Sequence, residues 1–225
     1  MTPERQETGT KETVFLVDDD KSVREGLASL LESTGMDVRV FSSADEFLSN
    51  GPSSDAAGCL VLDVKMPGMS GLDLQRQLKI ANIRLPVIFL TGHGDIPMTV
   101  HALKAGAVHF LTKPVRVPEL MGVIRQALET DRAARRERAA IQELQGNFDS
   151  LTRRQREVMA LVVAGKLNKQ IAHKLGTSER TIKLYRSQVM QKLRADSLAD
   201  LVKKAERLGI GGTTAEAHQA IEFPT

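Results

Sequence analysis

The chain has 225 residues, of which 41% are hydrophobic and 26% are charged, and these proportions are ordinary for folded soluble proteins. They exclude a chain that is disordered throughout. The sequence has no apolar run near the roughly 18 residues of a membrane span, and its polar start, Met1 to Thr13, is unlike a signal peptide. A single cysteine, Cys59, cannot form an internal disulfide or hold a zinc ion by itself. We therefore expect two domains of modest size in a cytoplasmic protein with no membrane partner.

The net charge of +3 is unevenly distributed along the chain. Residues 1–128 carry 13 basic and 16 acidic side chains, a net −3, and residues 129–148 carry 4 of each. Residues 149–212 carry 14 basic and 6 acidic side chains, a net +8. A short segment this basic suits a polyanion, which the acidic front part would repel. The two halves are therefore expected to meet different partners.

The first half alternates short apolar runs with longer segments of helical period. Apolar runs without polar alternation indicate strands buried on both faces, as in a parallel sheet covered by helices. This pattern predicts an α/β domain of (βα)5 type, with a doubly wound parallel sheet, over residues 12–130. The expected strands are Thr13–Val17, Val38–Phe41, Cys59–Leu62, Val87–Leu90 and Val108–Leu111. The expected helix starts are Ser22 with Glu25 and Ser43 with Glu46, both spaced as capping boxes, then Asp95 and Pro118.

Beyond the sheet domain we predict only helices. Residues 131–148 are rich in Arg, Ala, Glu and Gln but make a poor coiled-coil seam, so we interpret them as a solvated helical linker. Residues 149–210 are expected to form an all-α domain of four helices, and residues 211–225 a disordered tail. Two short helices broken by Gly176 and followed by a basic third helix have the form of a helix-turn-helix. The expected helix caps are Thr152 with Gln155, Asn168, Ser178, and Ser197 with Asp200.

Acidic side chains follow two of the predicted strands. Asp18, Asp19 and Asp20 come directly after the first strand, and Asp63 comes after the third. The carboxyl ends of parallel strands share one edge of the sheet, where four carboxylates would repel one another strongly without a cation. Oxygen ligands with open positions favour Mg²⁺. The sequence therefore predicts a magnesium site, although Asp20 alone is explained equally well as a helix N-cap.

Two further groups at the same edge suit chemistry on Asp63. The fourth strand ends at Thr91, a hydroxyl, and the fifth is followed by Lys113, an ammonium, and together they would cradle phosphoryl oxygens. About two added negative charges on Asp63 would draw both groups toward it. Phe110, on the fifth strand, could then move into the space that Thr91 vacates. Plain core packing is the alternative interpretation of Phe110.

These residues carry a resemblance to the receiver domain of two-component response regulators, covering roughly residues 13–130 and closest to the FixJ-type branch. Its motifs are Val17-Asp18-Asp19, Leu62-Asp63-Val64-Lys65-Met66-Pro67-Gly68, Thr91-Gly92-His93-Gly94-Asp95 and Lys113-Pro114. The resemblance implies that Asp63 accepts a phosphoryl group from a sensor histidine kinase.

The same resemblance assigns roles to the neighbours of Asp63. Asp19, Asp63 and the main-chain carbonyl of Lys65 would bind Mg²⁺, and Asp18 would complete the metal site by orienting the metal's waters. Thr91 and Phe110 would be the switch pair, Lys113 would contact the phosphoryl group, and the peptide between Lys113 and Pro114 would be cis.

The basic half presents a helix suited to the major groove of DNA. On the predicted helix Glu179–Leu193, a cation, an aliphatic side chain and small polar groups share one side. The residues expected to face bases or phosphates are Lys169, Arg180, Thr181, Lys183, Leu184, Arg186, Ser187 and Gln188. For any single lysine, a solvated basic face is at least as good an explanation.

This segment resembles the LuxR/NarL-type output domain over about 60 residues. Its motifs are Leu151-Thr152-Arg153-Arg154-Gln155-Arg156-Glu157-Val158, Asn168-Lys169-Gln170-Ile171-Ala172 and Thr181-Ile182-Lys183. The resemblance implies base contacts by Lys183, Leu184 and Ser187 and pairing of two copies through the helix over residues 198–208. The sequence departs from the family at Tyr185, where His is common, and at Leu167, where a small polar residue is usual.

We therefore predict a response regulator that is phosphorylated on Asp63, dimerises, binds double-stranded promoter DNA and acts as a transcriptional activator, with RNA polymerase as a further partner. It is not predicted to be an enzyme. One rival is an aspartyl-phosphate phosphatase of haloacid dehalogenase type, but such enzymes need a second acid two residues after the nucleophile, where this chain has Lys65. Another rival is a constitutive DNA binder whose receiver serves only for dimerisation.

Overall fold

The computed structural model describes residues 11–92 and 107–210, which divide into two compact units. The first unit ends at Arg135 and the second begins at Arg136. Two predictions fall outside the described residues: the helix expected to start at Asp95 and the disordered tail 211–225. Within the described ranges, no helix combines the length and the apolarity that crossing a membrane requires.

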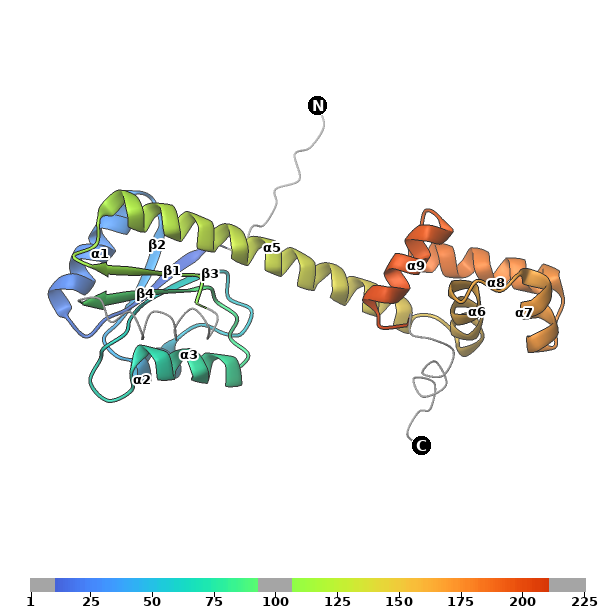
Figure 1. Ribbon diagram of the computed structural model, residues 1–225, viewed down its shortest axis with the longest axis horizontal. Helices are drawn as coiled ribbons and strands as arrows, with labels where there is room; N and C mark the ends of the chain where they lie inside the picture. Colours follow the sequence, from blue (N-terminus) through green and yellow to red (C-terminus); the bar gives the residue numbers. More distant parts are fainter. Residues whose placement is uncertain (1–10, 93–106, 211–225) are drawn as a thin grey trace, which may run out of the picture. The chain divides into compact units, whose positions relative to one another are not determined.

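The first unit is built on a five-stranded parallel sheet in the order β2-β1-β3-β4-β5 (Figure 1). The chain winds from β1 to β2 on one side and then to β3 on the other, so the order reverses beside β1. The predicted doubly wound sheet is confirmed, and each strand differs from its expected range by two residues or fewer. The strands are β1 (Thr13–Val17), β2 (Asp37–Phe41), β3 (Gly58–Asp63), β4 (Val87–Gly92) and β5 (His109–Lys113).

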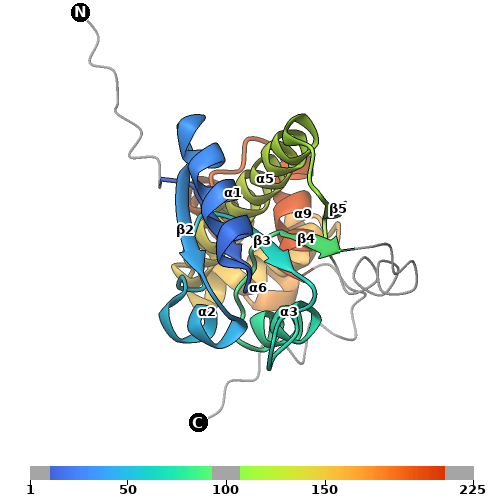
Figure 2. The same ribbon diagram turned by 90° about the vertical axis from the view of Figure 1, so that its left-hand side faces the viewer.

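Helices cover both faces of this sheet (Figures 1 and 2). One face carries α1 (Lys21–Ser33) and the first part of α5 (Val117–Asp149), and the other carries α2 (Ala44–Asn50) and α3 (Gly71–Ile80). Successive residues of β4 point to opposite faces, so Ile88 packs in the cluster with α1 and α5 whereas Phe89 packs in the cluster with α2 and α3. The inner strands β1, β3 and β4 are buried on both faces, as predicted, but the prediction is wrong for the edge strand β2, where Arg39 and Val40 are exposed.

The start of α1 differs from the prediction. The N-cap is Asp20, whose carboxylate accepts hydrogen bonds from the N–H groups of Ser22 (2.8 Å) and Val23 (3.2 Å). The capping box expected from Ser22 and Glu25 is therefore wrong. A carboxylate two residues upstream satisfies two free N–H groups and carries the charge that a helix N-terminus favours, so it wins over a hydroxyl.

The long helix α5 continues without a break beyond the sheet, from the first unit into the second. The last contacts of α5 with the rest of the first unit form a polar cluster. Asp131, 1% exposed, accepts hydrogen bonds from the N–H of Gly58 (3.0 Å) and from Nε of Arg135 (2.7 Å). Arg132 and Arg135 also donate to the carboxylate of Glu12, at 2.7 and 3.2 Å. These contacts fasten α5 to the beginnings of β1 and β3.

The described part of the second unit contains the end of α5 and four short helices around one apolar cluster. The helices are α6 (Arg153–Val163), α7 (Asn168–Leu175), α8 (Glu179–Lys192) and α9 (Leu198–Arg207). The capping box of Thr152 and Gln155 is confirmed. Gly176 ends α7 at φ 62°, a left-handed conformation that favours glycine, and lets the chain turn into α8.

The cap expected at Asn168 is wrong by one residue. The N-cap of α7 is Leu167, which has no polar side chain, and the side chain of Gln170 compensates by accepting the N–H of Leu167 at 2.9 Å. This leaves the amide oxygen of Asn168 free to accept a hydrogen bond from Arg186 of α8 at 2.7 Å. The helix α7 therefore begins one residue earlier than predicted, with the side chain of Gln170 in place of an N-cap side chain.

Candidate functional site

Three carboxylates meet at the carboxyl ends of β1 and β3, where the strand order reverses. Oxygen atoms of Asp18, Asp19 and Asp63 lie within 4.8 Å of one another. Asp18 is fully buried, Asp63 is buried and ends β3, and Asp19 is exposed at the mouth of the cluster. Three negative charges this close repel one another, so the arrangement requires a neutralising partner.

Lys113 supplies part of that neutralisation. It ends β5, and its Nζ donates to Oδ2 of Asp18 and to Oδ2 of Asp63, each at 2.6 Å. Burial works to lower the pKa of Lys113, but its hydrogen bonds with both carboxylates outweigh burial and raise the pKa. Burial also raises the pKa of Asp18, against the opposing effect of Lys113. The lysine is therefore a fixed cation between two carboxylates.

Main-chain groups hold the same carboxylates from the other side. The N–H of Asp20 donates to Asp18 at 3.0 Å, and the N–H of Lys65 donates to Asp63 at 3.2 Å. Nη1 of Arg24, on α1, donates to the main-chain carbonyls of Asp18 (2.6 Å) and Asp19 (3.4 Å). Arg24 was not singled out from the sequence, because a single arginine on an amphipathic helix gives no signal of this contact.

The remaining predicted members of this site lie on β4 and β5. Thr91 is buried, and its hydroxyl donates to the carbonyl of Gly92 at 3.0 Å. Phe110 pairs with Phe89 across the two strands and is half-buried against the cluster with α2 and α3. The peptide bond between Lys113 and Pro114 is cis. The receiver motif residues His93, Gly94 and Asp95 lie outside the described ranges.

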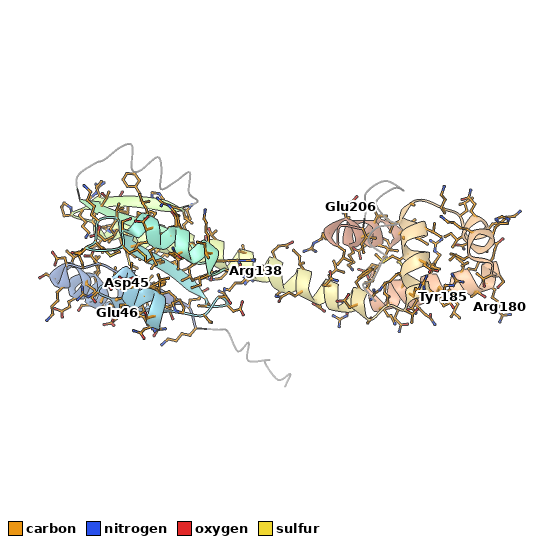
Figure 3. All side chains as sticks on the ribbon, turned by 90° about the horizontal axis from the view of Figure 1, so that it is seen from below. Asp45, Glu46, Arg138, Arg180, Tyr185 and Glu206 are labelled. Carbon is orange, nitrogen blue, oxygen red and sulfur yellow. The ribbon has the colours of Figure 1, made fainter. Side chains whose placement is uncertain are left out.

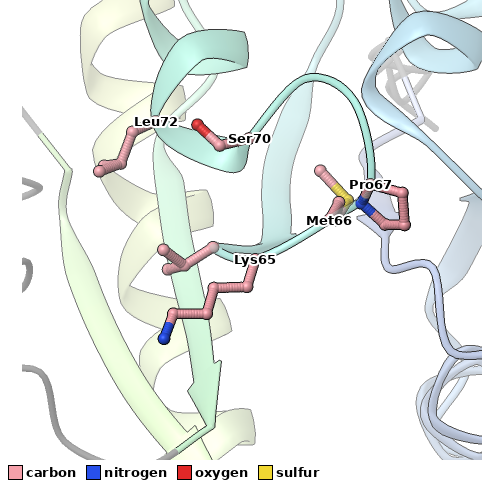
Figure 4. Close-up of a pocket in the computed structure, with 6 residues that line it drawn as sticks. Lys65, Met66, Pro67, Ser70 and Leu72 are labelled. Atoms are coloured by element: carbon pink, nitrogen blue, oxygen red, sulfur yellow. The ribbon is translucent and has the colours of Figure 1, made fainter.

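The loop after β3 forms a surface pocket of about 380 Å³ (Figure 4), and one of its lining residues, Val64, directly follows Asp63 in the sequence. It is lined by Val64, Lys65, Met66, Pro67, Ser70 and Leu72. No carboxylate lines it, so the pocket adjoins the acidic cluster without belonging to it. Lys65 takes part in both, because its N–H donates to Asp63 and the residue also lines the pocket.

In the second unit, α8 presents one open side. Lys183, Leu184 and Ser187 are exposed, and Leu184, at 56%, is unusually open for an aliphatic side chain. Arg180 is exposed near the start of the helix (Figure 3), and Lys169 is exposed on α7. These five side chains are the ones among the predicted DNA contacts that solvent reaches most freely.

The other predicted contacts are engaged within the unit. The hydroxyl of Thr181 lies 2.9 Å from that of Ser178, the N-cap of α8. Arg186 is half-buried on Asn168. The amide oxygen of Gln188 accepts a hydrogen bond from the side chain of Gln155 at 2.9 Å.

Gln155 connects the start of α6 to α8. It is 5% exposed and belongs to the capping box of α6. Its amide oxygen also accepts from Nζ of Lys192 at 3.1 Å, and the same ammonium donates to the carbonyl of Ser150 at 2.7 Å. Its helix-capping spacing was visible in the sequence, but its bond to α8 spans 33 positions and was not.

Two family models match the chain. The response regulator receiver domain matches residues 14–125, and the model described as bacterial regulatory proteins, luxR family, matches residues 149–205. The fold and the two sites thus define a two-component response regulator. The receiver domain implies a histidine kinase as partner, and the luxR-type domain implies DNA binding.

Relatives extend the match over nearly the whole chain. Nodulation protein W of Bradyrhizobium diazoefficiens is 48% identical over 95% of this chain and 93% of its own length. Transcriptional regulatory protein FixJ of the same species is 40% identical over 89% of this chain and 98% of its own length. Among solved structures, response regulator StyR has a TM-score of 0.79 and 48% identity, over 88% of this chain and 99% of that chain. The chain belongs to the NarL/FixJ family of response regulators, which regulate transcription.

Proposed function

We propose that this response regulator is switched by phosphorylation of Asp63, in a reaction that needs Mg²⁺, and that the phosphorylated chain binds promoter DNA as a dimer and activates transcription. The observation that carries the proposal is the cluster of Asp18, Asp19 and Asp63, with Lys113 bridging two of its members. The phosphoryl donor is a sensor histidine kinase. The comparisons with transcription regulators favour this function over that of a phosphatase.

The residues present suit a magnesium ion. Carboxylate oxygens from Asp18, Asp19 and Asp63, together with the main-chain carbonyl of Lys65, form a set of hard oxygen donors, which Mg²⁺ prefers. The single ammonium of Lys113 leaves the three carboxylates with a net negative charge. A bound Mg²⁺ would neutralise this charge and shield the incoming phosphoryl oxygens from it.

The chain's own residues arrange the transfer. A carboxylate oxygen of Asp63 forms the new bond to phosphorus, the bond from phosphorus to the donor imidazole nitrogen breaks, and the imidazole leaves with that electron pair and takes up a proton. Lys113, already 2.6 Å from Asp63, can exchange one carboxylate oxygen for a phosphoryl oxygen. Burial of Asp18 and Asp63 makes these charge interactions stronger than they would be in water.

Thr91 and Phe110 are proposed to carry the signal away from Asp63. Among the described residues, the hydroxyl of Thr91 donates to the neighbouring carbonyl of Gly92, and a new phosphoryl acceptor can redirect it. Phe110 is half-buried and lies two strand positions before Thr112, the residue paired with Thr91. Inward movement of Phe110 would then alter the surface around β5 and favour association of two copies.

On DNA, we propose that Lys183, Leu184 and Ser187 contact bases and that Lys169 and Arg180 contact phosphates, as their exposure allows. Thr181, Arg186 and Gln188 remain proposed DNA contacts. Each already has a hydrogen bond within the second unit, and it would have to break that bond or share it with DNA. Two phosphorylated copies would occupy paired half-sites, and activation would require contact with RNA polymerase.

The test of the acceptor is incorporation of phosphate from acetyl phosphate, followed on phosphate-affinity gels with and without Mg²⁺. We expect one Mg²⁺-dependent phosphoryl group in the wild type and none in Asp63→Asn. Asp45→Asn, an exposed carboxylate at the start of α2, is the matched control and should be labelled like the wild type. Labelling of Asp63→Asn at the wild-type rate would refute the proposal.

A further inference from the structure

The three carboxylates of the acidic cluster are held in different ways. Asp18 and Asp63 each bind Lys113 and a main-chain N–H through their side chains. The carboxylate of Asp19 forms no hydrogen bond or ion pair with any of the described residues, and it is the exposed member of the three. Its position therefore depends on the main chain that carries it.

Arg24 holds that main chain. Its side chain is half-buried and reaches back from the end of the first turn of α1 to the loop between β1 and α1. Nη1 donates to the carbonyl of Asp18 at 2.6 Å and lies 3.4 Å from the carbonyl of Asp19. These two carbonyls belong to the peptide planes on either side of the Cα atom of Asp19. Fixing both planes fixes the direction in which the side chain of Asp19 leaves the backbone.

We infer that Arg24 is a positioning residue for the Asp19 carboxylate and thereby sets the affinity of the acidic cluster for a divalent cation. The inference rests on the proposed function, because it takes the cluster to be the magnesium site. Without Arg24, both peptide planes can rotate, and binding of the cation must then also order the loop. Groups that orient metal ligands in this way typically contribute 10–100-fold to metal affinity.

The sign of the effect separates positioning from simple charge. Arg24 is a cation near a cation site, so its charge alone opposes Mg²⁺, and by Coulomb's law its removal should tighten binding. Positioning predicts the reverse. Lys21, on the same helix, is an exposed cation that donates to neither of these two carbonyls, so Lys21→Ala measures the effect of charge without a change in the loop.

The experiment is titration calorimetry of the full chain with Mg²⁺, with no phosphoryl donor present, for the wild type, Arg24→Ala, Arg24→Lys and Lys21→Ala. We expect the dissociation constant to rise roughly tenfold or more in Arg24→Ala, to rise less in Arg24→Lys, which can reach one carbonyl, and to stay equal or fall in Lys21→Ala. Amide hydrogen exchange of residues 18–21 in the metal-free chain should be faster in Arg24→Ala than in the wild type.

Equal or tighter binding of Mg²⁺ by both Arg24 variants, with unchanged amide exchange, would overturn the inference and leave the proposed function standing. A wild-type chain that binds no Mg²⁺ at millimolar concentration would overturn both. If Arg24→Ala does not fold, as judged by circular dichroism, Arg24→Lys carries the test. Phosphorylation by acetyl phosphate gives a second readout: saturating Mg²⁺ should restore the rate of an Arg24 variant, whereas a general folding defect would lower it at every Mg²⁺ concentration.

Discussion

At the scale of single residues, the position of a side chain along a strand of the sheet determines whether it lies at the acidic cluster or is buried in the core. Asp63 and Cys59 are both on β3, four positions apart, yet Asp63 lies at the strand end beside Lys113 and Cys59 lies at the other end of the strand, fully buried. The reactivity proposed for Asp63 therefore goes with its place at the carboxyl edge of the sheet. The environment of each residue decides its role more than its type does.

Cys59 provides a direct test of that burial. Burial, together with the nearby charge of Asp131 and Glu12, raises the pKa of the thiol to about 12. At pH 8 only roughly one thiol in 10⁴ would then be ionised, so a reagent that attacks thiolate should react very slowly with the native chain. We expect Ellman's reagent to label Cys59 within minutes only after unfolding in guanidinium. Stoichiometric labelling of the native chain at the rate of a free thiol would contradict this packing.

The carboxylate of Glu46 is expected to contribute to the loss of stability of the folded chain at low pH. The hydroxyl of Ser42 and then its N–H donate to the carboxylate at 2.6 and 2.7 Å and hold the pKa of Glu46 below its ordinary value of 4.5. A depressed pKa in the folded chain contributes stability above pH 4.5, and this is lost as the pH falls through the folded pKa. The melting temperature of Glu46→Gln should therefore fall less between pH 7 and pH 3 than that of the wild type. A control change at exposed Glu32 should follow the wild type, and an identical pH profile for Glu46→Gln would count against the assigned bonds.

At the scale of elements, the sequence predicted what is local and missed what depends on distant partners. The inner strands β1, β3 and β4 were predicted because buried parallel strands are continuously apolar, and the capping box of Thr152 was predicted because its partner is three residues away. Asp20 and Leu167 show the limit, since adjacent residues compete for one cap and their final positions depend on packing. The DNA contact of Gln188 stays a prediction, but no sequence pattern reveals its bond to Gln155.

At the scale of elements, the contribution of the contacts between α5 and the sheet to stability can be measured directly. Asp131→Ala would leave the N–H of Gly58 buried without its acceptor and would release Arg135. We expect a loss of about 2–4 kcal/mol in the free energy of unfolding of the first unit, measured by urea denaturation. Glu129→Ala, at an exposed position on the same helix, should cost less than about 0.5 kcal/mol. Equal effects of the two changes would mean that the buried cluster does not anchor the helix.

At the scale of the whole molecule, charge separates the two functions along the chain. The acidic cluster lies in a first half with net negative charge, and the open side of α8 lies in a segment of net +8. This segregation would keep the proposed phosphorylation site from competing for the DNA that the second unit is proposed to bind. Affinity for DNA should therefore come from the second unit and fall steeply with salt.

Substitution of two lysines should separate the contribution of phosphate contacts to DNA affinity from that of base contacts. Lys169→Ala should weaken binding about equally for all sequences and reduce the slope of log affinity against log salt by about 1. Lys183→Ala should cost about 1–3 kcal/mol on the preferred site and less on others, so that sequence preference falls. Competition binding at several salt concentrations measures both. The assignment of phosphate and base contacts would be wrong if the two variants behaved alike.

The most direct test of phosphorylation control is the affinity for a DNA fragment selected from a genomic pool, measured before and after treatment with acetyl phosphate and Mg²⁺. We predict that treatment raises the affinity of the wild type by roughly tenfold, within the range typical of coupled sites, and leaves Asp63→Ala unchanged. Equal affinity of the treated and untreated wild type, or the same increase in Asp63→Ala, would contradict the account and favour a constitutive DNA binder.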